Sequence, residues 1–161
     1  MRTLVAAFAA VIVAGCSTGG SSAPVHTPST GAASGCGSTS IFNGTPPDWL
    51  NTPNNPVGLP YVLAKPPEAA GFLFAQPLRA GHPGNPANKI LWVVHVPRNG
   101  SVLHITGHPV GTTAPTIDQI EPANSSPGEI YPSIVDVPQR GCWQFDLAWA
   151  GNKASVELLY K

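Results

Sequence analysis

Two histidines flank a turn sequence, and imidazoles are common ligands of copper and zinc. The stretch from His95 to His104 reads HVPRNGSVLH, with Asn99 and Gly100 at its centre. Asn-Gly is a preferred dipeptide for the two-residue loop of a type I′ hairpin. With that loop, His95 lies directly opposite His104, and Cβ atoms of opposed residues are about 4.5–5.5 Å apart. The spacing therefore predicts a cross-strand histidine pair that could share a copper or zinc ion.

The alternative is a pair of histidines on a half-exposed sheet face without a metal. Structural zinc takes four protein ligands and catalytic zinc usually three. His108 is about 13 Å further along the predicted strand, and His82 lies in a loop rich in proline and glycine. A third ligand would have to approach from elsewhere, and a four-residue loop in place of the two-residue one would remove the pairing altogether.

Acidic residues form a second candidate pair near the C-terminus. The segments GCWQFDLAW and KASVELLY flank Gly151 and Asn152, and a hairpin with that loop places Asp146 opposite Glu157. Paired carboxylates can act as the acid and base of a glycosidase. On an open sheet face without an evident cleft, however, we expect solvated charges, and the remaining alternative is a cation site. Three more acidic residues are expected in solvated loops: Asp118, Glu121 and Glu129.

Motifs of common enzyme classes are absent from the sequence. It has no nucleophile elbow, phosphate-cradling glycine loop or zinc-protease helix motif. A serine–histidine arrangement would depend on the fold and not on spacing, so a hydrolase of unknown substrate stays an alternative. Eight basic and eight acidic residues give a net charge of zero, and the basic residues form no nucleic-acid footprint. We expect a non-enzymatic protein that needs no cofactor and binds no nucleic acid.

The N-terminus carries a targeting pattern. Arg2 precedes the apolar run LVAAFAAVIV, which is shorter than the roughly 20 residues of a membrane span and is typical of a signal-peptide core. The run ends in VAGC, Val13 to Cys16, which resembles the lipobox of bacterial lipoproteins. This resemblance implies cleavage of residues 1–15 and acylation of Cys16, and so a lipid anchor on the extracytoplasmic side of the cell membrane. The alternative is an ordinary secretory peptide.

The remaining chain divides into a linker and one domain. Residues 16–35 are mostly Gly, Ser, Thr, Ala and Pro, a composition that favours a disordered, flexible tether. Residues 36–161 are enough for a single core. With Cys16 carrying lipid, only Cys36 and Cys142 remain, in a compartment that permits disulfides. We therefore predict that they pair and close a loop of about 100 residues.

The domain is predicted to be all-β. Its apolar runs are short, rich in β-branched and aromatic residues, and bounded by Gly, Pro and Asn. Further strands are expected at 59–63 and 71–75, and Trp49 and Leu50 either plug one end of the fold or form an exposed contact surface. Alternation in the first hairpin puts one set of side chains in the core: Trp92, Val94, Val96, Leu103 and Ile105. The C-terminal hairpin pairs Trp149 with Ala154, Leu147 with Val156, Phe145 with Leu158, and Trp143 with Tyr160, all on the core face.

The segment GEIYPSIVDVPQRGCWQFDLAW resembles the C-terminal part of uncharacterised bacterial lipoproteins, especially actinobacterial ones. The matching residues are Pro132, Ser133, Val137, Pro138, Gly141, Cys142 and Trp143. The resemblance implies an immunoglobulin-like antiparallel β-sandwich and no known activity. Cys142 departs from the antibody pattern, because it alternates with the core face. Its bridge to Cys36 is therefore expected to hold the N-terminal segment to an outer face or edge and not to join the two sheets.

These patterns indicate a lipid-anchored, extracytoplasmic protein with a binding or accessory role. Its expected partners are the membrane, through the lipid, and an envelope protein, polymer or small ligand. One alternative is a copper- or zinc-binding envelope protein that uses His95 and His104. The other is the hydrolase of unknown substrate.

Overall fold

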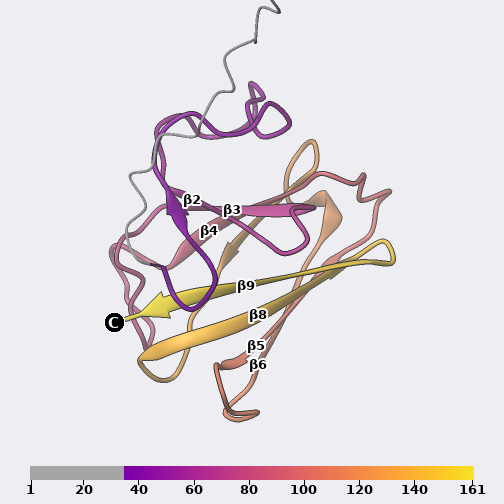
Figure 1. Ribbon diagram of the computed structural model, residues 1–161. Coiled ribbons are helices and arrows are strands. Elements are labelled where there is room, and N and C mark those ends of the chain that lie inside the picture. Colours follow the sequence, from indigo (N-terminus) through magenta and orange to yellow (C-terminus); the bar gives the residue numbers. More distant parts are fainter. Residues whose placement is uncertain (1–34) are drawn as a thin grey trace, which may run out of the picture.

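The computed structural model describes residues 35–161 of the protein. The predicted signal peptide, the lipidation site at Cys16 and the linker up to residue 34 lie outside the described residues. Two antiparallel sheets pack face to face (Figure 1). The predicted all-β sandwich is confirmed.

Nine strands make up the two sheets. The first has the order β1-β2-β3-β4-β7 and contains β1 (Ile41–Phe42), β2 (Tyr61–Leu63), β3 (Ala69–Leu73), β4 (Lys89–Val94) and β7 (Ile130–Ile134). The second has the order β6-β5-β8-β9 and contains β6 (Ile117–Glu121), β5 (Leu103–Pro109), β8 (Gly141–Trp149) and β9 (Asn152–Tyr160). A single 3-10 turn, η1 (Ala123–Ser125), lies between β6 and β7. Among residues 35–161, no helix has the length and apolar character needed to cross a membrane.

Three crossings between the sheets give the sandwich its topology. The chain changes sheet between β4 and β5, between β6 and β7, and between β7 and β8, so that β4 pairs with β7 and β5 pairs with β8. Strands B and E, and strands C and F, are neighbours in the same way in immunoglobulin domains. β6 beside β5 corresponds to the strand C′ of variable domains. The described strands depart from antibodies in adding the short β1 and β2 beyond β3.

The turn predicted at Asn99 and Gly100 forms, but the hairpin around it does not. These two residues have φ angles of 49° and 75°, and Ser101 N donates a hydrogen bond to Arg98 O at 2.8 Å, as in a type I′ turn. The strands that follow and precede the turn lie in different sheets. Arg98 binds the first residue of β7, since its guanidinium donates to the carbonyl of Ile130 at 2.8 Å.

The chain crosses to the second sheet because β4 is buried on both faces and has a neighbouring strand on each side. Five of its six residues are buried, and its neighbours β3 and β7 extend the first sheet on either side. β5 is buried on one face only. Trp92 and Val94 of β4 enter the same core as Leu103 and Ile105 of β5. These four residues are in the core as predicted, although they come from opposing sheets. Val96, which was also predicted for the core, is only partly buried and lies outside it.

The C-terminal hairpin is confirmed with a register shifted by two residues. Its loop consists of Ala150 and Gly151, with φ angles of 45° and 83°, instead of Gly151 and Asn152. Leu147 therefore pairs with Ala154, and Phe145 with Val156. A shift of two residues leaves every side chain on the same face. All eight residues predicted for the core are buried there.

A third layer covers the outer face of the first sheet. Leu50, in the segment between β1 and β2, is fully buried and packs against outward-facing residues that include Phe72, Leu91 and Val93. This segment passes over β2 and β3 in Figure 1. Trp49 is partly buried in the same cluster. Trp49 and Leu50 therefore cover a sheet face and do not plug the end of the sandwich.

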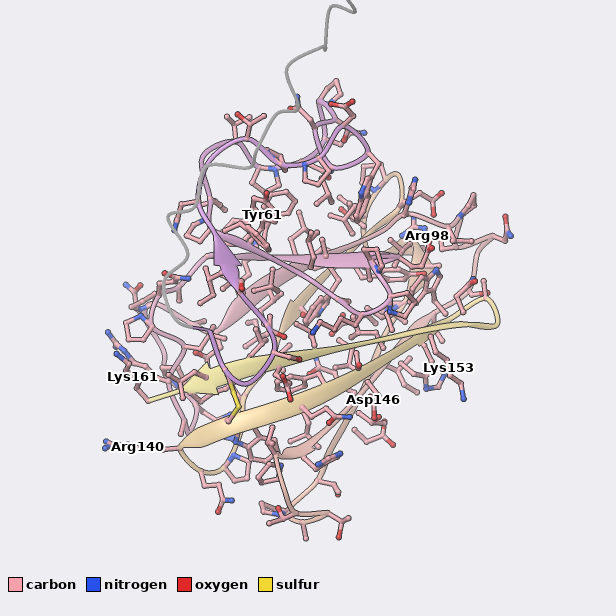
Figure 2. All side chains as sticks on the ribbon, viewed as in Figure 1. Tyr61, Arg98, Arg140, Asp146, Lys153 and Lys161 are labelled. Atoms are coloured by element: carbon pink, nitrogen blue, oxygen red, sulfur yellow. A yellow bond between two sulfur atoms is a disulfide. The ribbon has the colours of Figure 1, made fainter. Side chains whose placement is uncertain are left out.

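The predicted disulfide joins Cys36 to Cys142, with Cα atoms 5.5 Å apart and a sequence separation of 106 (Figure 2). Cys142 lies on the outer side of β8, directly before the core residue Trp143. The segment after Cys36 is also held by hydrogen bonds to β9, because Ser38 Oγ donates to Glu157 Oε2 at 2.8 Å and Glu157 N donates to Thr39 Oγ1 at 2.9 Å. The bridge thus fixes the N-terminal segment to the outer face of the second sheet.

We expect Ala150→Asn to stabilise the protein. Ala150 has a φ of 45°, in the left-handed region that costs most residues roughly 1–2 kcal/mol and that asparagine tolerates. Because Asn-Gly is the preferred type I′ dipeptide, the free energy of unfolding in urea should rise by about 0.5–1 kcal/mol. The matched control is Asn99→Ala, which makes the reverse change in the other turn and should lower it. An unchanged or lower urea midpoint for Ala150→Asn contradicts the loop assignment.

Candidate functional site

The structure separates the two histidines that the sequence pairs. His95 directly follows β4 of the first sheet, and its ring stacks on Trp49 with the ring centroids 4.8 Å apart. His104 lies on β5 of the second sheet, between Ile120 of β6 and Ala148 of β8. The predicted cross-strand pair is wrong because the chain crosses between the sheets at this turn. The copper or zinc hypothesis loses the ligand pair on which it was built.

The two other histidines within residues 35–161 have partners of different kinds. His82 Nδ1 lies 2.7 Å from Asp136 Oδ2, and His108 Nδ1 lies 3.1 Å from the carbonyl oxygen of Pro109. Within residues 35–161, no group of three or more His, Cys, Asp or Glu residues could hold a metal ion.

The acidic residues also lie apart. Asp146 is opposite Ser155, and Glu157 is opposite Gln144, so the predicted carboxylate pair is wrong for the same two-residue shift that changes the hairpin loop. Asp118 and Glu121 lie on β6 and not in loops. Burial raises the pKa of Glu121, and a hydrogen bond from Gln119 opposes that rise.

Of the three acidic residues that were expected in loops, Glu129 is the one that lies in a loop. It lies directly before β7, and its Oε2 accepts a hydrogen bond from Arg98 N at 2.6 Å. Glu129 is therefore tied to the turn between β4 and β5 and is not a freely solvated charge.

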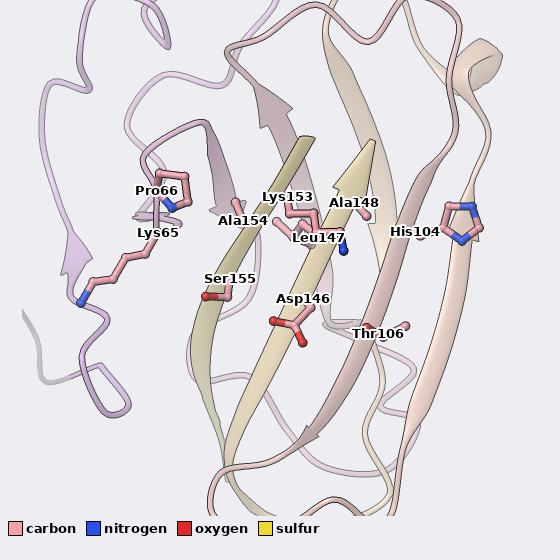
Figure 3. A pocket seen from close by; sticks show the side chains of 10 residues that line it. All are labelled: Lys65, Pro66, His104, Thr106, Asp146, Leu147, Ala148, Lys153, Ala154 and Ser155. Atoms are coloured by element: carbon pink, nitrogen blue, oxygen red, sulfur yellow. The ribbon is translucent and has the colours of Figure 1, made fainter. Parts of the chain in front are cut away.

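A groove with a volume of about 590 Å³ lies on the outer face of the second sheet. Thr106, Asp146 and Ser155 form one cross-strand row on β5, β8 and β9. His104, Ala148 and Lys153 form the next row. Figure 3 shows His104 and Lys65 at opposite sides of this groove. The groove, defined by these two rows and Lys65, is the candidate functional site.

Side-chain size makes this face hollow. Thr106, Ala148 and Ser155 are short, while the longer side chains of Lys65, Lys153 and His104 also line the groove. Lys65 is fixed beside β9, because Lys65 N donates to Ser155 O at 2.7 Å and Ser155 N donates to Lys65 O at 2.9 Å. A segment distant in sequence therefore lies along the edge of β9 and forms one side of the groove.

The groove offers both signs of charge and several hydrogen-bonding groups. Asp146 carries a carboxylate, and Lys65 and Lys153 carry ammonium groups. The hydroxyls of Thr106 and Ser155 can donate and accept hydrogen bonds. Gln144 Nε2 donates to Asp146 Oδ1 at 3.3 Å, which leaves further lone pairs of this carboxylate for a ligand. Such a surface can bind a ligand that carries donors and acceptors of its own.

Sequence reasoning named His104 and Asp146 but not the groove they share. The signal that it could have used is the run of small residues at outward positions, such as Ala148 and Ser155. Its meaning depends on the pairing of β5 with β8, which local patterns do not specify. Comparisons with models of protein families, with curated proteins and with solved structures found no match to this chain.

Separation of the two histidines leads to a prediction about metals. In calorimetric titration with copper or zinc, we expect His104→Ala to bind as the unchanged protein does, because no partner imidazole faces His104 across the strand pair. His82→Ala, at an exposed position beside Asp136, is the matched control for loss of one surface histidine. Stoichiometric micromolar binding that disappears in both His95→Ala and His104→Ala would contradict the arrangement of the two sheets.

Proposed function

We propose that the protein is a non-enzymatic binding domain, anchored by lipid on the extracytoplasmic side of a bacterial cell membrane. The lipobox resemblance at Val13 to Cys16 and the Gly/Ser/Pro-rich linker support the anchor and the tether. The disulfide between Cys36 and Cys142 supports an oxidising compartment, where such bonds persist. A tethered domain of this kind suits an accessory or binding role at the envelope.

The groove on the outer face of the second sheet is the observation that carries the binding role. Its volume of about 590 Å³ falls within the range of small-ligand sites. Its floor is built from strands that pair on both sides, β5 and β8, so the groups that would contact a ligand stand on a rigid base. The proposed partner is an envelope protein, an envelope polymer or a small ligand with both hydrogen-bond donors and acceptors.

The lipid anchor can be tested by fractionation. The full-length protein should sediment with membranes of the cells that produce it and should enter the detergent phase of a phase-separation assay. Cys16→Ala should move it to the aqueous phase, because it removes the proposed acylation site. Cys36→Ala serves as the control, since loss of that cysteine should leave the partitioning unchanged. Equal partitioning of Cys16→Ala and the unchanged protein would overturn the anchor.

The groove can be tested by photo-crosslinking in intact cells. A benzophenone amino acid at Thr106, on the floor of the groove, should give light-dependent adducts of higher mass. The matched control carries the same group at Val57, which is 93% exposed in the segment between β1 and β2 and lies outside the groove. Adducts at Val57 alone, or in equal yield at both positions, would overturn the groove as the binding surface.

A further inference from the structure

A buried polar atom without a protein partner marks a second hollow, on the other sheet. Asn55 is only 8% exposed. Its Nδ2 donates to Leu50 O at 2.7 Å, whereas its Oδ1 has no hydrogen-bond partner. An unpaired buried acceptor costs about 1–3 kcal/mol. Burial of Oδ1 without a partner therefore lowers the stability of this segment unless a water or another donor reaches it.

Asn55 lines a pocket of about 240 Å³. The pocket, which we call the Asn55 pocket, is formed by three segments: the third layer contributes Trp49, Thr52 and Asn54, the end of β4 contributes His95, and the residues before β7 contribute Glu129. A water molecule occupies about 30 Å³ of liquid volume. The pocket is thus several times larger than one water needs to satisfy Oδ1.

One wall of the Asn55 pocket is aromatic. The rings of Trp49 and His95 stack with an interplanar angle of 16°, and both line the pocket. His95 is held in place by its backbone, since His95 N donates to Glu68 O at 2.8 Å. The stacked pair presents a fixed apolar surface beside the polar groups.

The polar groups in this pocket favour a ligand rich in hydrogen-bond donors. Asn55 Oδ1 can only accept, and the carboxylate of Glu129 retains lone pairs after accepting from Arg98 N. Thr52 and Asn54 can both donate and accept. The guanidinium of Arg98 is bound to the carbonyl of Ile130, a lining residue, and this positive charge offsets part of the negative charge of the Glu129 carboxylate. Neutral hydroxyl groups match the pocket better.

We propose that the Asn55 pocket binds one neutral sugar residue, either free or at the end of an envelope glycan. Hydroxyls of the sugar donate to Glu129 and exchange hydrogen bonds with Thr52 and Asn54, and the apolar C–H face of the ring packs against Trp49. Asn55 Oδ1 is shielded in this structure and joins these contacts when the Asn55 side chain turns toward the sugar. The volume of about 240 Å³ suits a single ring. This site lies on the first sheet and is independent of the groove, so the failure of either leaves the other standing.

The test is calorimetric titration of the full-length protein in a detergent without a sugar headgroup. The probes are a panel of neutral hexoses, pentoses and N-acetylhexosamines, with tetramethylammonium chloride as the cationic probe. We expect saturable one-to-one binding of at least one sugar at millimolar concentrations or below, and none of tetramethylammonium. Cell-wall glycan fragments with the same terminal sugar form a second arm. Tighter binding of the fragments indicates a glycan end as the natural ligand, and equal binding indicates a free sugar.

Two variants test whether the sugar binds in the Asn55 pocket. Trp49→Ala should weaken sugar binding by about tenfold or more, and Asn55→Ala by at least as much, as expected for the loss of one good contact. Asn55→Ala also removes the hydrogen bond to Leu50 O. If that variant fails to fold, Trp49→Ala, at a partly exposed position, still tests the proposal. His82→Ala, elsewhere on the surface, is the control and should bind normally.

Three results would overturn the proposal. The first is the absence of saturable binding by every sugar in the panel, which would leave water as the partner of Asn55 Oδ1. The second is binding of tetramethylammonium that depends on Trp49, which would make this a cation site. The third is sugar binding that neither variant weakens.

Discussion

Burial of β4 on both faces is the constraint on which the rest of the structure depends. One face, with Trp92, enters the core between the sheets, and the other, with Leu91 and Val93, needs a separate cover. Both hydrogen-bonding edges of β4 are occupied, one by β3 and the other by β7. The following strand, β5, therefore finds no free edge beside β4 and joins the opposite sheet. The segment that supplies Leu50 has to cross the outer face, and this third layer also builds the Asn55 pocket.

Local chemistry predicted more of this fold than long-range pairing did. The type I′ turn at Asn99 depends on two residues and forms as predicted, but whether it joins paired strands depends on the competition of β3 and β7 for β4. Alternation identified the core residues of the C-terminal hairpin, yet it cannot distinguish registers that differ by two residues. The expected pairing of Cys36 with Cys142 rested on compartment and cysteine number, which do not require knowledge of strand order.

Neither hollow could be located from the sequence, because each brings together distant segments. The groove needs β5 beside β8 and Lys65 beside β9. The Asn55 pocket needs Trp49, His95 and Glu129 to meet at one edge of the first sheet. His95 and His104 were correctly singled out as informative residues, but each contributes to a different hollow on a different sheet. Their proximity in sequence reflects the sharp crossing of the chain and not a shared site.

The position of the disulfide has a mechanical consequence. A pulling force applied to the chain before Cys36 passes through the covalent bridge into Cys142 and so into β8. That strand is paired along its length with β5 on one side and β9 on the other, so the load is shared among many hydrogen bonds. The short β1, which pairs with β2 at only two positions, is bypassed. A domain held by its N-terminal end could thus bear tension without losing its outermost strand first.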